Sequence, residues 1–484
     1  MKRNLIALAL SLAALPAGAA EDTELASSGD DDDPFDFNIR VGYVRSLRRA
    51  AVKRELIGEV QNRPLLSTLT VKDLRYTQVR HTLPLRAEIG IWQDLQLHVE
   101  APLVISDQRE LLFAHNEGKS CTFSGQENVE LGELPTCVDG RNSTVVRDGL
   151  IDVDPADQTY WGTEGEERLV GGSDIGASEP GVTLPKRSGL DQLNVGLTYA
   201  LLSQARDDTK PTWTLGFEWR IAVGEAMDYD PKRPDDNTSV GRGIHDLVVQ
   251  TAFAKTLTYV EPFMKIWWAY PIAKDDSLFK DHKGGQDKVG PQQHAGVDFG
   301  LEIFALNRPE SKQRIGFEIG GGITAAFEGR GYSEMWEVFR RNPELDGPCG
   351  VDGDDDGALD SRGETWASCD LTPGQGGDDD GLIQHPGVTD IENYATLGGR
   401  LAVRTQVGEF VKFRIGLALA HDLEHYISFT DAGQDRGDED VLVTPNDARE
   451  IHPLHRPLID QIGRRFRVEE TTVFEFFVSG MILF

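Results

Sequence analysis

Apolar and polar residues alternate along many separate stretches of this chain. The last of them, Thr471 to Phe484, reads TTVFEFFVSGMILF, and every second residue counted back from Phe484 is apolar or small. Alternate residues of a β-strand share one face, and Glu475 and Ser479 fall on the other face. The pattern predicts a strand with one apolar face, either in a transmembrane β-barrel or buried at the end of a soluble β-sandwich.

The same alternation predicts about twelve strands, near residues 35–43, 83–91, 95–103, 193–199, 213–221, 247–253, 264–270, 295–303, 315–327, 397–403, 411–419 and 471–484. The connections are long after the first strand and after every second strand from there, and short elsewhere. A barrel with both chain ends in the periplasm predicts this pattern, whereas a sandwich has no reason to gather its long connections at one end. The predicted fold is therefore all-β, a transmembrane antiparallel up-and-down barrel with long extracellular loops, including insertions at about 107–188 and 329–389.

The beginning of the chain is typical of an exported protein. Lys2 and Arg3 precede the apolar run Leu5 to Leu15, and small residues lead to a predicted cut near Ala19 or Ala20. The apolar run is shorter than the roughly 20 residues that a spanning helix needs. We therefore expect a signal peptide at 1–20, an acidic periplasmic segment at 21–34 and the barrel at 35–484. The acidic segment is predicted to be a disordered lead-in, with a plug of the barrel as the alternative.

Composition and charge narrow the partners and the location. The formal net charge of −31 argues against nucleic acid, whose phosphates need Lys and Arg. A hydrophobic content of 39% suits a barrel, in which only alternate strand residues face lipid. The expected location is the outer membrane of a Gram-negative bacterium. The expected partners are its lipid, small solutes, and the barrel-assembly machinery, which would read the C-terminal strand ending in Phe484.

Many charged residues fall on the predicted lumen face of the strands. They are Arg40, Arg86, Glu88, Glu100, Glu218, Arg220, Lys265, Asp298, Glu302, Glu318, Arg400, Arg404, Lys412 and Arg414. The acidic residues concentrate on the middle strands and the basic ones on the late strands. Opposed walls of charge would orient polar solutes in a narrow pore. The alternative is that these side chains pair directly and fill the lumen.

One outer loop resembles a calcium loop. Carboxylates stand at its positions 1, 3, 5 and 9, namely Asp352, Asp354, Asp356 and Asp360. Gly357 occupies position 6, but position 12 is Gly363 where a calcium loop has Glu. Calcium is therefore one interpretation of this loop and a solvated acidic loop is the other. No other cofactor is indicated.

Four cysteines in an exported chain indicate disulfides. Local pairing would join Cys121 to Cys137 and Cys349 to Cys369, so that each long loop is closed on itself. Pairing between the two loops stays open. In either case the cysteines are expected to be structural.

An enzyme would need a nucleophile and a base brought together. His421, His425 and Ser428 lie near the outer end of the eleventh predicted strand, and His81 and His98 lie near the start of the barrel. Some barrels of this size are calcium-dependent phospholipases, but no nucleophile motif surrounds Ser428. We therefore predict that the chain is not an enzyme.

Two stretches resemble an outer-membrane family associated with the phenol meta-degradation pathway (MetA-type). They are LPLRAEIGIWQDLQLHVEAP at Leu83 to Pro102 and SGLDQLNVGLTYALL at Ser188 to Leu202. The chain departs from that family's pattern at Asp191 and around Gly224, and its Cys-bearing loops look like additions. The resemblance implies a porin-like channel for small or aromatic molecules. The alternative is a surface protein whose barrel only anchors loops used for binding or adhesion.

Overall fold

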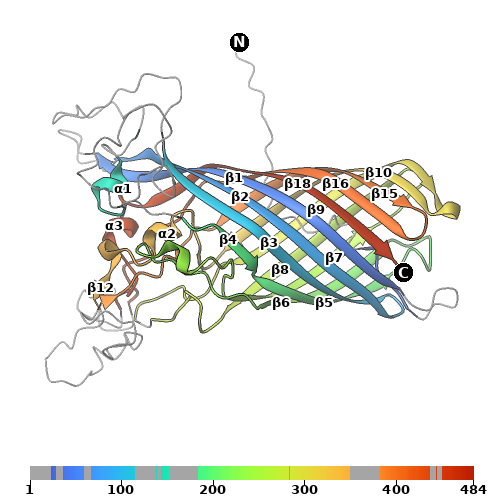
Figure 1. Cartoon of the computed structure of the whole chain (residues 1–484), viewed down its shortest axis with the longest axis horizontal. Coiled ribbons are helices and arrows are strands. Elements are labelled where there is room, and N and C mark those ends of the chain that lie inside the picture. Colours follow the sequence, from blue (N-terminus) through green and yellow to red (C-terminus); the bar gives the residue numbers. More distant parts are fainter. Residues whose placement is uncertain are drawn as a thin grey trace, which may run out of the picture.

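The computed structural model describes residues 23–28, 36–58, 67–114, 138, 143–151, 184–282, 284–348, 382–435, 443 and 450–484. Twelve long antiparallel strands form one closed barrel (Figure 1). They are β1 (Phe37–Gly58), β2 (Ser67–Trp92), β3 (Leu95–Phe113), β5 (Gln192–Leu202), β6 (Thr212–Ala222), β7 (Ile244–Ala254), β8 (Val260–Ala273), β9 (Gln293–Arg308), β10 (Gln313–Phe327), β15 (Tyr394–Val407), β16 (Val411–Asp422) and β18 (Phe466–Leu483). Each pairs with the next in this order, and β1 pairs with β18 to close the ring.

The alternation in the sequence sorts side chains between the two faces of the wall. On β10, Phe317, Ile319 and Ile323 are 50–52% exposed on the outside, whereas Glu318 between them is 1% exposed. The other strands repeat this arrangement of exposed apolar side chains. An apolar outer surface of this kind is stable in hydrocarbon. Closing the sheet into a barrel lets the backbone groups of each membrane-spanning strand form hydrogen bonds with a neighbouring strand on both sides. The predicted transmembrane barrel is confirmed and the soluble sandwich is excluded, because the twelve long strands close into one ring through the pairing of β1 with β18.

Exposed aromatic side chains ring both ends of the apolar band. Trp92, Tyr259, Phe410 and Phe484 lie at the end with the short turns, and each is more than 60% exposed. Trp219, Trp268 and Tyr270 are exposed toward the other end. Such aromatic girdles mark the two membrane interfaces of transmembrane barrels.

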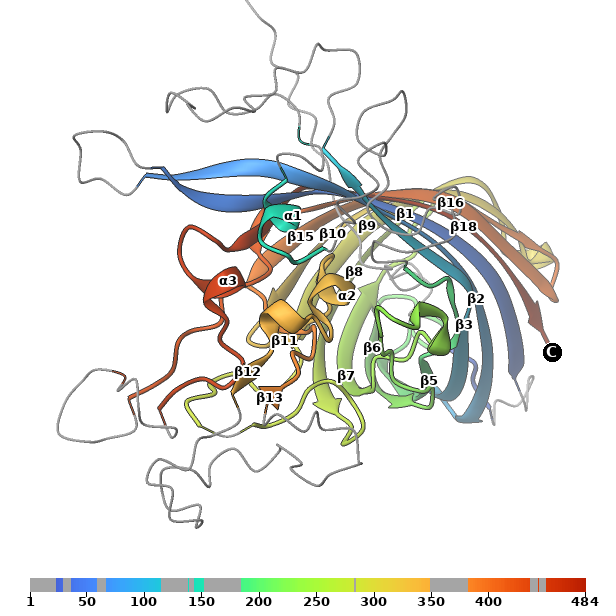
Figure 2. The same ribbon diagram turned by 60° about the vertical axis from the view of Figure 1, so that its left-hand side comes forward.

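The short connections are found where the sequence predicts them, but the first connection is much shorter than expected. We expected a long loop over 44–82, whereas β1 and β2 continue through most of it, to Gly58 and from Ser67. β18 likewise begins at Phe466 and not at Thr471. Figure 2 shows β1 and β2 projecting past the barrel as a ribbon. Outside the membrane a strand's outer face has no need to be apolar, so the alternation is lost while the backbone ladder continues.

The long connections fold over one end of the barrel and form a cap (Figures 1 and 2). Its described residues contain three helices of one turn, α1 (Thr144–Arg147), α2 (Trp336–Phe339) and α3 (Pro457–Asp460). It also holds two described 3₁₀ turns, η3 (Pro234–Asp236) and η5 (Pro343–Leu345), while η4 (Pro309–Ser311) lies at the opposite end of the barrel. The short strands are β4 (Arg187–Leu190), β11 (Arg330–Gly331), β12 (Gly347–Pro348), β13 (Leu382–Ile383), β14 (Thr389–Asp390) and β17 (His425–Tyr426). No helix in the described ranges is long and apolar enough to cross a membrane.

The largest cluster of buried apolar side chains in the described residues lies in the cap and the strand ends around it. It joins Leu74 and Leu111 from the strands with Trp336 and Phe339 from α2, and with Ile459 from α3. The barrel itself has a polar interior. The apolar core of this molecule therefore fixes the cap to the barrel rim and leaves the lumen to charged groups.

Candidate functional site: a charged lumen closed at both ends

A buried carboxylate joins two basic strands in the middle of the lumen. Glu318 on β10 accepts a hydrogen bond from Arg400 Nε at 2.5 Å and from Arg414 Nη2 at 3.0 Å. The three side chains are 0%, 2% and 8% exposed. The guanidinium of Arg400 also lies 5.5 Å from the ring centroid of Phe263. Charges this far from water are stable only with partners, so this cluster holds the three consecutive strands β10, β15 and β16 together on the inner face of the wall.

Glu302 on β9 reaches past a glycine to make a second cluster. Its Oε2 accepts from Arg404 Nη1 at 2.8 Å and from Arg314 Nη2 at 3.1 Å. Gly316 lies on β10 between them, and a Cβ there would stand 2.0 Å from Glu302 Oε1. The absence of a side chain at Gly316 leaves the space through which Glu302 of β9 reaches Arg404 of β15. Arg314 also binds Glu261 at 2.6 Å.

A second contact that passes a glycine on the intervening strand lies on the other side of the barrel. His98 Nε2 on β3 lies 2.9 Å from Glu218 Oε2 on β6, and Gly196 on the intervening β5 leaves the space for it. Glu218 also accepts from Arg220 Nε at 2.7 Å. On β8, Lys265 stands opposite Asp298 of β9 in the strand register. These contacts bring together acidic and basic groups that lie far apart in the sequence.

The first three strands carry a further group of predicted lumen charges. Arg86 Nε donates to Glu88 Oε1 at 2.7 Å, and its Nη1 lies 3.3 Å from Glu100. Arg40 Nη2 is 3.7 Å from Glu88. Most of the predicted charges therefore take part in ion pairs on the inner face, within one strand, between neighbouring strands or across one intervening strand. Direct pairing of this kind is what the second interpretation describes.

The N-terminal segment lies in the periplasmic mouth. Ala26 N donates to Gln96 Oε1 at 2.7 Å, and Ser28 Oγ donates to the carbonyl of Gly90 at 2.6 Å. Gly90 makes room for this approach, because a Cβ there would lie 2.5 Å from the Ser27 carbonyl carbon. Residues 23–28 are thus bound to the barrel wall, as the alternative of a plug predicts, and we call them the N-terminal plug.

One side chain of the N-terminal plug crosses the mouth. Glu24 is bound by Arg404 Nη2 at 3.1 Å and by Lys412 Nζ at 2.9 Å. Burial would raise the pKa of Glu24, but the charges of Lys412 and Arg404 outweigh it and hold that pKa well below its ordinary value. The carboxylate is therefore ionised in this position. A cavity of about 30 Å³, room for little more than a water, remains beside it.

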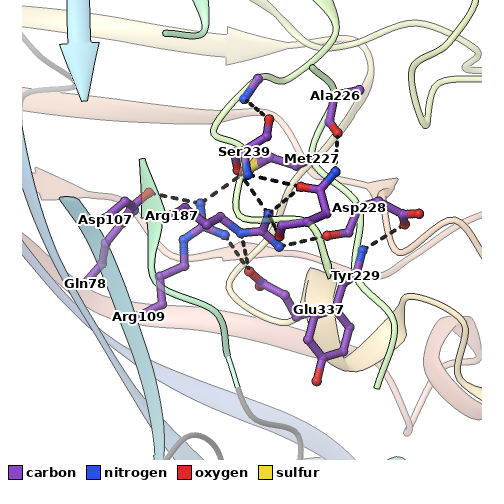
Figure 3. A network of polar contacts seen from close by, with 12 residues as sticks. Gln78, Asp107, Arg109, Arg187, Ala226, Met227, Asp228, Tyr229, Ser239 and Glu337 are labelled. Carbon is purple, nitrogen blue, oxygen red and sulfur yellow. Dashed lines mark hydrogen bonds and ion pairs between the residues drawn. The ribbon is translucent and has the colours of Figure 1, made fainter. Parts of the chain in front are cut away.

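A second network closes the extracellular end (Figure 3). Arg109 Nη1 of β3 donates to Glu337 Oε1 of α2 at 2.7 Å, and Arg187 Nε lies 3.7 Å from the same oxygen. Arg187 also donates to the carbonyls of Asp228 and Ser239, both at 3.0 Å, and so holds the β6–β7 connection inside the rim. Burial raises the pKa of Glu337, against the opposing charges of Arg109 and Arg187.

Between this network and the barrel wall lies a cavity of about 250 Å³, which we call the outer cavity. Its charged and aromatic lining consists of Arg48, Arg80, Arg109, Arg242, Asp191, Glu334, Tyr76, Tyr332, Trp336 and Tyr394. The arginines are turned into it more than their partners are. Arg80 is 38% exposed and its partner Asp107 0%, while Arg48 is 25% exposed and Glu334 6%. The outer cavity therefore presents positive groups.

The remaining predicted residues lie apart from this lumen or outside the described residues. Ser428 Oγ donates to the carbonyl of Ile459, and His425 Nδ1 lies 2.8 Å from the carbonyl oxygen of Leu423, so neither faces the other as nucleophile and base. Phe484 is 62% exposed at the rim. The calcium-loop aspartates and the four cysteines fall outside the described residues. Within the part that is described, no group of three His, Cys, Asp or Glu residues is arranged to hold a metal.

Sequence reasoning missed several residues of the lumen and its ends. Arg314 has the same parity on β10 as Glu318, so the alternation could have identified it. Glu24 lies in a segment without periodicity, and no signal in the sequence points to its partners. Arg187 and Glu337 lie in the long polar connections, where no periodic pattern in the sequence indicates which residues come into contact.

No family model matches the chain, and no curated protein matches it. Solved structures similar to it include an outer-membrane channel (COG4313) of Pseudomonas putida F1, with 9% identity, 92% of this chain and 96% of that chain covered, and a TM-score of 0.37. The P. putida toluene transporter TodX has 9% identity over 93% of this chain and 90% of its own, with a TM-score of 0.31. A Pseudomonas aeruginosa FadL homologue has 6% identity over 93% and 90%, with a TM-score of 0.29. Likenesses this remote carry no argument about solute or mechanism, and the resemblance to the phenol meta-degradation family stays a prediction.

Proposed function

We propose that this chain is an outer-membrane channel for small molecules, which cross a narrow and charged lumen. The observation that carries the proposal is the contrast between the two faces of one closed wall. The outer face is apolar between two aromatic girdles, and the inner face carries ion-paired charges from end to end. A membrane-spanning barrel with a polar interior is the architecture of a conduit, and charges along it set what passes.

The outer cavity supports a permeant of modest size. An apolar cavity of about 150 Å³ accommodates benzene, so about 250 Å³ suits a solute with one ring and a polar substituent. The rings of Tyr332 and Trp336 in its wall offer faces for stacking. Small aromatic solutes are therefore included in the proposal, together with other polar solutes of that size.

A barrel that only anchors its outer loops is the second candidate. It is favoured by the closely paired lumen and by the network of Arg109, Arg187 and Glu337, which ties the loops over the barrel. A surface protein needs such a rigid platform and no conduction. The channel and the anchor differ in one measurable property, passage of ions.

Reconstitution in planar lipid bilayers separates the two candidates. The channel predicts discrete openings, and the reversal potential in a salt gradient should shift toward cation selectivity when Arg86→Gln removes a lumen charge. Glu409→Gln, at a turn where the side chain is 60% exposed, is the matched control and should leave selectivity unchanged. A silent bilayer with correctly folded protein would favour the anchor.

A further inference from the structure

We infer that Arg404 and Lys412 form a carboxylate-binding site at the periplasmic mouth, which Glu24 fills from within the chain and which the carboxylate of a small organic anion takes over. The identity of the anion as a permeant rests on the proposed channel function. The site itself is independent of transport, because binding there can be measured on the folded protein alone.

The contacts of Glu24 define what the site accepts. Its two oxygens go to two different donors, Oε1 to Arg404 Nη2 at 3.1 Å and Oε2 to Lys412 Nζ at 2.9 Å. A carboxylate meets these two donors with one oxygen each, as Glu24 does, whereas a chloride ion would have to serve both donors with one atom. Glu24 thus serves as a tethered example of the ligand.

Arg404 is also held by a contact that does not involve Glu24. Arg404 also donates from Nη1 to Glu302 Oε2 at 2.8 Å, and this second contact holds the guanidinium in place. The side chains of Glu24 and Lys412 are 31% and 24% exposed, so a solute can reach them. The neighbouring Arg314 lines the same small cavity and adds positive charge.

Exchange of one carboxylate for another removes one anchor of the N-terminal plug, which loosens the plug while its other contacts remain. Ala26 and Ser28 are bound to Gln96 and Gly90 on the β2–β3 side of the mouth. β3 is five strands away from β15 around the twelve-strand ring, so only the Glu24 end spans the lumen. The tether gives Glu24 an effective concentration on the order of millimolar, which free anions must match.

The outer cavity presents the same chemistry at the other end of the lumen. The side chains of Arg80 and Arg242, which line it, are 38% and 37% exposed. Asp107, the partner of Arg80, is 0% exposed, and Asp191, the partner of Arg242, also lines the cavity and is 20% exposed. A carboxylate entering from outside would therefore meet exposed basic groups at both ends.

Hydrogen–deuterium exchange of the peptide covering residues 23–28 tests the site in the full chain in detergent. The backbone N–H groups of Ala26, Ser27 and Ser28 all donate within the structure, so their exchange reports whether the plug is seated. Exchange should rise saturably with benzoate or acetate, and not with equal concentrations of chloride or the neutral acetamide. In Glu24→Gln, the half-saturating benzoate concentration for binding at the site, measured by calorimetry, should fall roughly tenfold because the tethered competitor is gone. Lys412→Gln should abolish that binding, and Glu409→Gln should leave it as in the unmodified chain.

Two outcomes would overturn the inference. One is exchange that rises equally with chloride, because that is a response to ionic strength and not to a carboxylate. The other is benzoate binding that is the same in the unmodified chain, Glu24→Gln and Lys412→Gln. A silent bilayer together with carboxylate-specific exchange would remove the channel and keep the site, so the two proposals fail separately.

Discussion

The Glu318 cluster offers the sharpest energetic prediction. Glu318→Gln keeps the size of the side chain but removes the only negative charge shared by Arg400 and Arg414 in the contacts described above. The two guanidinium groups are 2% and 8% exposed, so water does not replace the lost partner. Removing one partner of a buried ion pair costs about 3–5 kcal/mol, because the remaining charge stays buried. We expect the free energy of unfolding to fall by that amount.

Reversible urea unfolding in phospholipid vesicles, followed by tryptophan fluorescence, measures this loss. Glu409→Gln is the control for charge removal, and a surface change of this kind should stay within about 0.5 kcal/mol. A triple variant, Glu318→Leu with Arg400→Met and Arg414→Met, removes all three charges and should recover most of the stability. A loss below about 1 kcal/mol for Glu318→Gln would mean that water solvates the cluster, and the account of a dry, paired lumen would be wrong.

Three further predictions test the space left by Gly316, the lipid-facing side of the barrel and the pH dependence of the cap. Gly316→Val should displace the carboxylate of Glu302 and cost about 2 kcal/mol or more in the same unfolding assay. Phe317→Arg, on the lipid face, should cost about 2–4 kcal/mol, and Phe317→Leu much less. Burial lowers the pKa values of four cap histidines, that of His452 to about 3, so their stabilisation is present above pH 6.5 and lost as the pH falls toward 4. Asp460, whose pKa burial raises to about 7, acts in the opposite direction, as do Asp390 and Glu337, whose pKa values burial also raises. The histidines dominate this balance because their ordinary pKa of about 6.5 lies between pH 5 and pH 7, whereas that of the carboxyl groups lies below pH 5. Hydrogen-exchange protection of the cap, corrected for intrinsic rates, should therefore be at least about tenfold lower at pH 5 than at pH 7; equal protection would contradict this balance.

The fold could be predicted because the membrane imposes a strict rule on every strand. Residues such as Phe317 and Ile319 must face hydrocarbon, so the alternation and the strand order were both visible in the sequence. The rule stops at the membrane surface. For this reason the extensions of β1 and β2 beyond the barrel, and the start of β18 at Phe466, could not be recognised.

The lumen was predicted in composition but not in pairing. Alternation placed Glu318 and Arg400 on the inner face, yet it could not say that Glu302 would reach Arg404 two strands away. That contact depends on the register of three strands and on the space left by Gly316. Glu24 was beyond reach altogether, because its partners come from the far end of the chain and its own segment has no period.

The central claim is that the barrel is a conduit whose periplasmic mouth is closed by the N-terminal plug. Single-channel conductance in planar bilayers, compared between the full chain and a variant lacking residues 23–28, tests it most directly. We predict low or intermittent conductance for the full chain and a several-fold larger, steadier conductance for the deletion. Two folded proteins that are equally silent, or that conduct equally, would contradict the claim.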